Sequence, residues 1–237
     1  MTARMIHVSV RESRMCVDRI LLVARCLPGY VSAVRDCVLL SQALGLGGFE
    51  HLLRHYERLR MASLEAVAVT DDAAGAMIDA GGMHAWLVAP AVADIGVDIA
   101  RRCGRADLRV RGVEERRELA TVCALMPRYG AAATYRSEDA GGATLLVTNA
   151  SPPRTAAQWD PLLHHAFRHG FAVDEALWRS VYALSNSALA PDSVVSRRHA
   201  GPVILKDDGT LFGRVPQDDD FDPNMLRNVA RTPQEHS

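Results

Sequence analysis

Short apolar runs alternate with helix-like segments across the middle of this chain, and this alternation restricts the possible folds more than any other feature. Most runs are bounded by glycine, aspartate or another turn-forming residue, which is typical of strands. The runs are LEAVAVTD (64–71), GAMIDA (75–80), HAWLVAP (84–90), DLRVRGV (107–113), YGAAATYRS (129–137) and ATLLVTN (143–149). Helical patterns occur over 91–103 and 114–126. We therefore predict an α/β fold of mixed α+β type, with a mixed sheet and flanking helices.

Helical periodicity dominates on either side of this region. The N-terminal helices are predicted over 10–26, 31–44 and 49–59, and the C-terminal ones over 156–169 and 173–189. Two β-prone runs flank Asp207-Asp208-Gly209 and predict a β-hairpin in VILKDDGTLFGRV (203–215).

We expect a single α/β domain over residues 1–215. Its parts are a helical N-terminal part (1–62), a mixed α/β part (63–151), and helices with the hairpin (152–215). A peripheral tail is expected over 216–237 because that segment is polar and rich in aspartate.

Charge and hydrophobicity exclude several classes of protein. The formal net charge is -1, so we expect binding neither to nucleic acid nor to an anionic membrane. No apolar run approaches the ~20 residues of a membrane helix, and the N-terminus lacks the apolar core of a signal peptide. The five cysteines include no CxxC pair, which is typical of reduced thiols. These features predict a cytoplasmic protein.

The strongest candidate site lies between Pro191, which should end a helix, and the hairpin. Within it, Arg197 is the candidate substrate-binding residue because a guanidinium can hold a carboxylate or phosphate in bidentate fashion. His199 is the candidate for proton transfer, with Asp192 and Ser196 as polar partners. The alternative is a capped turn with exposed charges.

A weaker candidate is a metal site on the helix PLLHHAFRHG. His165 and His169 are four positions apart and share a helix face, so both could bind one metal ion. The glutamate that follows the first histidine in zinc metalloproteases is absent, so we favour an ordinary solvated face. No motif in the chain requires a cofactor, and the identity of any cofactor stays open.

The C-terminal segment resembles an uncharacterised bacterial family of similar length, a domain of unknown function. Its pattern of tryptophan, proline, Ser-Arg and a small-residue turn is matched by Trp178, Pro191, Ser196-Arg197 and Ala200-Gly201. Ser187 replaces the family's threonine, and His199 stands at a position where a glycine is usual. The resemblance implies a shared fold and no particular activity.

A second, weaker resemblance is to the type-2 malate/L-lactate dehydrogenases. It covers residues 7 to 151 and includes Thr148-Asn149-Ala150-Ser151-Pro152, which is similar to that family's Thr-Asn-x-Ser-Pro and makes Asn149 a candidate substrate-binding residue. The family's catalytic Ser-His-Gly would fall at Gly47-Gly48-Phe49, and its Asn-Ser-x-His loop near 112–115. Both histidines are missing, so the resemblance implies a scaffold with altered catalytic residues and a homodimer, and not a standard NAD(P)-dependent dehydrogenase.

We expect a bacterial metabolic or biosynthetic enzyme that acts on a small carboxylate-bearing metabolite. The alternative is a non-catalytic, homodimeric partner or binding protein, and a metal-dependent enzyme that uses His165 and His169 comes third. The sequence leaves the substrate, the reaction and the use of nicotinamide open.

Overall fold

A mixed five-stranded sheet with strand order β2-β3-β4-β6-β5 lies within residues 68–149. Its strands are β2 (Ala68–Asp71), β3 (Gly75–Asp79), β4 (Arg105–Arg111), β5 (Ala131–Ser137) and β6 (Ala143–Asn149). β3 and β4 are parallel, and the other neighbouring pairs are antiparallel. This computed structural model describes residues 4–71, 75–138, 142–189, 204–205 and 211–212. The sheet and its helices confirm the predicted α/β class.

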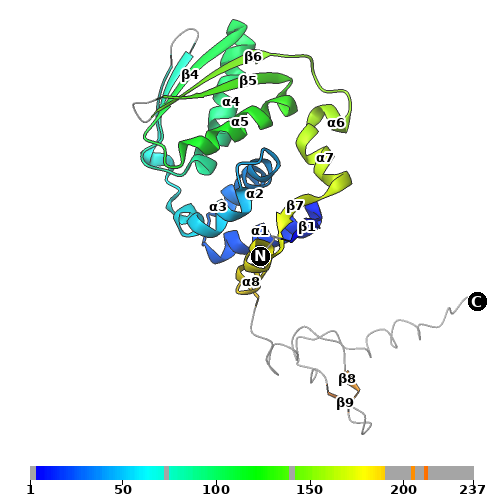
Figure 1. Ribbon diagram of the computed structural model, residues 1–237. Coiled ribbons are helices and arrows are strands. Elements are labelled where there is room, and N and C mark those ends of the chain that lie inside the picture. The colour runs from blue at the N-terminus through cyan, green and yellow to red at the C-terminus, as the bar shows by residue number, and fades with distance from the viewer. Residues whose placement is uncertain (1–3, 72–74, 139–141, 190–203, 206–210, 213–237) are drawn as a thin grey trace, which may run out of the picture. The chain divides into compact units, whose positions relative to one another are not determined.

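Side chains alternate between the two faces of the sheet, as β4 illustrates. Ala106, Leu108 and Val110 point inward and are buried, whereas the arginines and the aspartate between them are exposed. Helix α4 (Ala85–Cys103) packs on the buried face, against β4 and β6 (Figure 1). The contact is close at Gly96, where a Cβ would lie 2.8 Å from Val147 Cγ2.

The prediction of a strand over 84–90 is wrong, because these residues cap and begin α4. His84 is the N-cap, and every residue from Ala85 to Ala89 is buried. A helix that is covered on all sides has no polar face, so its apolar run cannot be distinguished from a buried strand by periodicity. Pro90 lies inside the helix, whereas the sequence prediction ended a strand at this residue and began a helix at 91.

The N-terminal helices form a second layer. Helix α2 of this layer packs against α4, on the side of α4 away from the sheet (Figure 1). The predicted N-terminal helices are confirmed as α1 (Val10–Val23), α2 (Pro28–Ala43), and α3 (Gly48–His55) continued by the 3-10 helix η1 (Tyr56–Met61). Helix α8 (Glu175–Asn186), which the sequence predicted over 173–189, packs on α1 and α3. The sequence did not predict strands β1 (Met5–Val8) and β7 (Phe171–Asp174), which pair antiparallel.

Two predicted helices are interrupted in the structure. The segment predicted over 114–126 consists of η3 (Arg116–Ala120), α5 (Thr121–Leu125) and the start of η4 (Met126–Tyr129). A further short 3-10 helix, η2 (Leu64–Ala66), precedes β2. The helix predicted over 156–169 is divided into α6 (Ala156–Trp159) and α7 (Pro161–His169). The division falls at Asp160, which caps α7, and at Pro161, which cannot continue α6.

The chain divides into two compact units, Met1–Leu189 and Ala190–Ser237. In the second unit β8 (Ile204–Leu205) and β9 (Leu211–Phe212) pair antiparallel, as the predicted hairpin requires. The domain bounds proposed from the sequence stay a prediction. Within the described residues, no helix is both long and apolar enough to cross a membrane.

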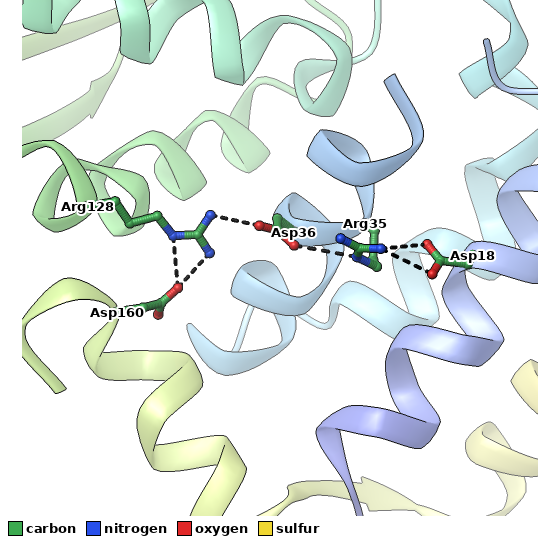
Figure 2. Close-up of polar contacts among 5 residues, drawn as sticks. All are labelled: Asp18, Arg35, Asp36, Arg128 and Asp160. Atoms are coloured by element: carbon green, nitrogen blue, oxygen red, sulfur yellow. Dashed lines mark hydrogen bonds and ion pairs between the residues drawn. The ribbon is translucent and has the colours of Figure 1, made fainter. Parts of the chain in front are cut away.

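A chain of ion pairs joins four segments of the first unit (Figure 2). Arg128 of η4 binds Asp36 of α2, with Nη1 2.7 Å from Oδ2, and Asp160, with Nη2 2.5 Å from Oδ2. Arg35 continues the chain from Asp36 to Asp18 of α1. Arg128 and Asp160 are mostly buried, so this network ties the sheet-side layer to the N-terminal helices and to α7.

Candidate functional site

Helix α3 carries two histidines on the same side. His51 and His55 are four positions apart, and their ring centroids lie 4.4 Å from each other. The helix begins in close contact with α2, since a Cβ on Gly48 would lie 2.2 Å from the carbonyl oxygen of Val38. Only glycine fits at this contact, which determines where α3 places its histidines.

The loop after β4 reaches the start of α4 because β3 and β4 are parallel neighbours. Backbone hydrogen bonds continue the pairing beyond both strands. The N–H of Gly82 donates to Gly112 at 2.6 Å, that of Glu114 to Met83 at 2.9 Å, and that of Ala85 to Glu114 at 2.9 Å. The loop that carries Glu114 and Glu115 is therefore held beside the first turn of α4.

His84 connects these two segments. It is 1% exposed, and its Nδ1 accepts the backbone N–H of Trp86 at 3.1 Å. A ring nitrogen that accepts a hydrogen bond carries no proton, so neutral His84 is protonated on Nε2. Nε2 of His84 lies 3.0 Å from Nε2 of His51. It follows that His84 donates this hydrogen bond and His51 accepts it, which leaves the proton of neutral His51 on Nδ1.

Burial keeps these two imidazoles neutral. Desolvation lowers the pKa of His84 to about 3 and the pKa of His51 to about 4. Repulsion from the neighbouring histidine makes a smaller contribution to each of these two shifts. Near neutral pH both rings are therefore uncharged, and each keeps the single proton that its hydrogen bonds assign to it.

Trp86 and Glu118 support the histidines from the core. The indole Nε1–H of Trp86 donates to Oε2 of Glu118 at 2.9 Å, and its ring centroid lies 4.9 Å from that of His51. Both residues are buried, and burial raises the pKa of the Glu118 carboxyl above its ordinary value. These contacts restrict movement of His51 and His84.

His55 and Glu115 form the more open side of the site. Nε2 of His55 lies 3.7 Å from Oε1 of Glu115, and the two side chains are 14% and 38% exposed. Glu115 has a φ of 53°, a left-handed backbone conformation that is uncommon for residues other than glycine. Such strain is frequent at functional sites. We refer to His51, His55 and His84 as the histidine cluster.

A cavity of about 230 Å³ adjoins the cluster. It is lined by Arg58, Met61, Gly82, His84 and Glu114. Arg58 lies in this lining with its Nη1 2.5 Å from Oε2 of Glu114. A guanidinium in this position can exchange the glutamate for the carboxylate of a bound molecule.

Three residues of the site have metal-binding side chains that converge. His51, His55 and Glu115 each offer one ligand atom, and these atoms all lie within 4.8 Å of one another. Within residues 4–71, 75–138 and 142–189, this is the only group of three such residues that could hold a metal ion.

The site residues predicted from the sequence lie elsewhere. Asp192, Ser196, Arg197 and His199 fall outside the described residues, so their role stays a prediction. Asn149 ends β6, and its Nδ2 donates to the carbonyl of Ala100 in α4 at 2.8 Å, a contact that holds the helix to the sheet. Its proposed part in substrate binding also stays a prediction.

His165 and His169 do share a face of α7, with ring centroids 4.5 Å apart. Both are exposed, and the described part of the chain supplies no third metal ligand beside them. The same i, i+4 spacing occurs at His51 and His55, where the sequence interpretation overlooked it. That spacing was the one available signal, because His84 and Glu115 join the site only through the fold.

Comparisons with known proteins find similar structures, but no similar sequence. No protein-family model matches the chain, and no curated protein matches its sequence. A dehydrogenase from Sinorhizobium meliloti has a similar structure, with a TM-score of 0.57 and 10% identity, over 77% of this chain and 100% of that one. An E. coli protein proposed to be a malate/lactate dehydrogenase gives a TM-score of 0.57 at 6% identity, over 81% of this chain and 98% of its own.

At such low identity these similarities establish the fold alone. They confirm that the scaffold is dehydrogenase-like, as the weaker of the two sequence resemblances implied. The resemblance to an uncharacterised bacterial family stays a prediction.

Proposed function

We propose that this chain is a small-molecule enzyme that acts on a carboxylate-bearing metabolite, with its reaction centre at the histidine cluster. The observation that carries the proposal is the arrangement of buried neutral imidazoles beside a cavity whose wall includes Arg58. A buried, hydrogen-bonded group with a strongly shifted pKa beside a cavity is a recognised mark of a functional site.

The residues divide into a binding part and a reacting part. Arg58 is suited to bind the carboxylate of the metabolite, because a guanidinium pairs with carboxylates in a fixed, bidentate geometry. His84 belongs to the lining of the same cavity, and His51, His55 and Glu115, which offer lone pairs and protons, lie beside it. Malate and lactate, which are named for the E. coli protein of similar fold, are carboxylates of this kind.

The position of the cluster on the scaffold supports altered catalytic residues. The dehydrogenase resemblance assigns one catalytic histidine to Gly48 and the other to the loop near Glu115. Gly48 has no room for a side chain, but His51 lies one helical turn further along α3. The loop contributes Glu115 in place of a histidine. The chain therefore keeps ionisable groups at both places and changes their identity.

Ligand binding tests the proposal directly. We expect at least one member of a panel of small mono- and dicarboxylates to raise the melting temperature of the wild-type protein, and mass spectrometry to detect its conversion. Arg58→Gln should remove the shift. Arg54→Gln, which loses only an exposed pair with Glu50 on the same helix, should retain it. A panel without any effect on the wild type, or an unchanged shift in Arg58→Gln, would contradict the proposal.

A non-catalytic, homodimeric binding protein is the second candidate. The cavity volume favours it, since about 230 Å³ is below the roughly 300 Å³ of ordinary ligand sites. Tight binding to another protein, with no conversion of any carboxylate and no small-molecule shift of the melting temperature, would select this candidate. Sedimentation of the purified protein would test the homodimer, which is part of both candidates.

A further inference from the structure

Two members of the histidine cluster, together with the neighbouring Glu115, form a set of residues that is characteristic of transition-metal sites. His51 and His55 project from one side of α3 at the i, i+4 spacing that lets two imidazoles reach one ion. Glu115 approaches from the loop after β4, with Oε1 3.7 Å from Nε2 of His55. We propose that His51, His55 and Glu115 bind a divalent transition metal of the zinc class, and we refer to these three residues as the triad.

The distances are close to those of a formed site. Tetrahedral zinc with bonds of about 2.0–2.1 Å places neighbouring ligand atoms about 3.3 Å apart. The three ligand atoms already lie within 4.8 Å of one another, and one pair is at 3.7 Å. No pair of ligand atoms therefore has to approach by more than about 1.5 Å to reach this spacing.

The composition of the ligand set indicates a reactive metal. Two histidines and one glutamate are the protein ligands of several hydrolytic zinc sites, in which the fourth position holds water or substrate. Four cysteine or histidine ligands, which are typical of structural zinc, are not assembled at this place among the described residues. The cavity lined by Arg58 and His84 lies beside the three proposed ligands, because His84 is hydrogen-bonded to His51 and Glu114 of the lining precedes Glu115 in the chain.

Neighbouring side chains and backbone hydrogen bonds orient the ligands. The indole of Trp86 packs against His51, and its Nε1–H is anchored by Glu118. Backbone hydrogen bonds hold the segment before Glu115 against the start of α4. The site is thus built on a helix and on a loop fixed by the sheet, which limits the freedom of all three ligands.

His84 has a different role, because its tautomer is already determined. Nδ1 accepts from Trp86, so only the Nε2–H group faces His51, and His84 offers no lone pair to a metal. A metal bound at Nε2 of His51 displaces this hydrogen bond. A metal bound at Nδ1 moves the proton of His51 to Nε2, which also ends it. By either nitrogen, His84 competes with the metal for His51.

The inference goes beyond the proposed function and does not depend on it. Metal binding can be measured on the purified protein without any substrate, so a failure of either proposal leaves the other testable. Carboxylate binding through Arg58 and metal binding through the triad use different side chains and different measurements.

Titration of metal-free protein with Co²⁺ and Zn²⁺, followed by absorbance and calorimetry, tests the site. We expect one equivalent of metal and a visible Co²⁺ spectrum of a tetrahedral or five-coordinate site. His55→Gln and Glu115→Gln should each weaken binding by at least about tenfold, a loss that even second-shell changes can cause. The control His165→Gln/His169→Gln removes the other histidine pair and should bind as the wild type does.

Circular dichroism establishes that His55→Gln and Glu115→Gln are folded before the titration. Absence of binding to the wild type, or equal affinity in His55→Gln and Glu115→Gln, would overturn the proposal. Loss of binding only in the His165→Gln/His169→Gln variant would do the same, because the metal would then belong to α7.

The variant His84→Ser distinguishes whether His84 competes with the metal for His51 or itself binds the metal. Serine keeps a side-chain acceptor at the N-cap of α4 and removes the imidazole N–H. If His84 competes for His51, the variant binds Zn²⁺ more tightly, by roughly twofold to tenfold for one hydrogen bond no longer lost. Weaker binding in His84→Ser would show that His84 is itself a ligand, which would overturn the assigned ligand set.

Discussion

His84 and His51 are 33 positions apart in the chain and share one hydrogen bond, with their Nε2 atoms 3.0 Å from each other. The first residue caps α4, and the second lies on α3. Because the cap assigns the proton of His84 to Nε2, a backbone feature of one helix determines the protonation of a ring on another. A structural element and the candidate reaction centre therefore depend on each other.

The cap itself can be measured. His84→Ala and His84→Ser remove the same imidazole, but only serine can accept the N–H of Trp86. We expect His84→Ala to be less stable than His84→Ser by about 1 kcal/mol, the usual value of an N-cap side chain. Urea unfolding followed by circular dichroism gives the comparison. Equal stability of the two variants would mean that the cap contributes nothing.

The buried ion pairs of Arg128 predict a large loss of stability. Arg128→Met leaves the buried Asp160 without its guanidinium and leaves Asp36 with Arg35 alone, which should cost about 3–5 kcal/mol. Arg102→Gln is the matched control, because it breaks an exposed pair with Asp98 that is worth less than about 1 kcal/mol. Denaturant midpoints of the two variants measure the difference. Similar midpoints would show that the network is not stabilising.

Glu118 predicts a dependence of stability on pH. Burial raises its pKa in the folded state, so the folded protein holds this proton more tightly than the unfolded chain does. Stability contributed by the protonated form is present below the unfolded pKa and is lost as the pH rises through the folded pKa, at about 1.4 kcal/mol for each unit of difference.

Glu118→Gln keeps an oxygen acceptor for Trp86 and cannot ionise. We therefore expect the variant to gain stability relative to the wild type as the pH rises from 4 to 8. Thermal unfolding across this range measures the effect. A wild type that gains stability relative to the variant over the same range would contradict the assigned direction of the pKa shift.

Substitution by alanine at two glycines, Gly48 at the contact between α3 and α2 and Gly29 in α2, should change stability in opposite directions. A Cβ at Gly48 would meet the carbonyl oxygen of Val38 at 2.2 Å, so Gly48→Ala should destabilise the protein by about 1–3 kcal/mol and displace α3. Gly29, near the start of α2, has no atom within 4 Å of such a Cβ, and Gly29→Ala should be neutral or stabilising by up to about 1 kcal/mol. Melting temperatures test both, and a neutral Gly48→Ala would be inconsistent with this packing.

The sequence predicted those elements whose polar and apolar residues alternate with a clear period. Helix α1 has one buried face, and β4 alternates strictly, so each was predicted with small errors at its ends. The start of α4 was missed because its residues are buried on all sides. Strands β1 and β7 were missed because each is only four residues long.

The candidate site was less accessible to sequence reasoning than the fold. Only His51 and His55 are near each other in the chain. His84 joins them because it caps α4, and Glu115 joins them because the parallel pairing of β3 and β4 brings the following loop beside that cap. Neither relationship has a local pattern, so no spacing rule could have assembled these residues.

Anomalous diffraction at the zinc absorption edge, on crystals of the protein loaded with Zn²⁺, tests the metal site at His51, His55 and Glu115 most directly. We predict one strong peak bonded to His51, His55 and Glu115, with ligand distances of about 2.0–2.2 Å and a fourth position open to the cavity beside Arg58. A peak bonded elsewhere on the protein, or no peak at the triad in fully loaded crystals, would contradict this account.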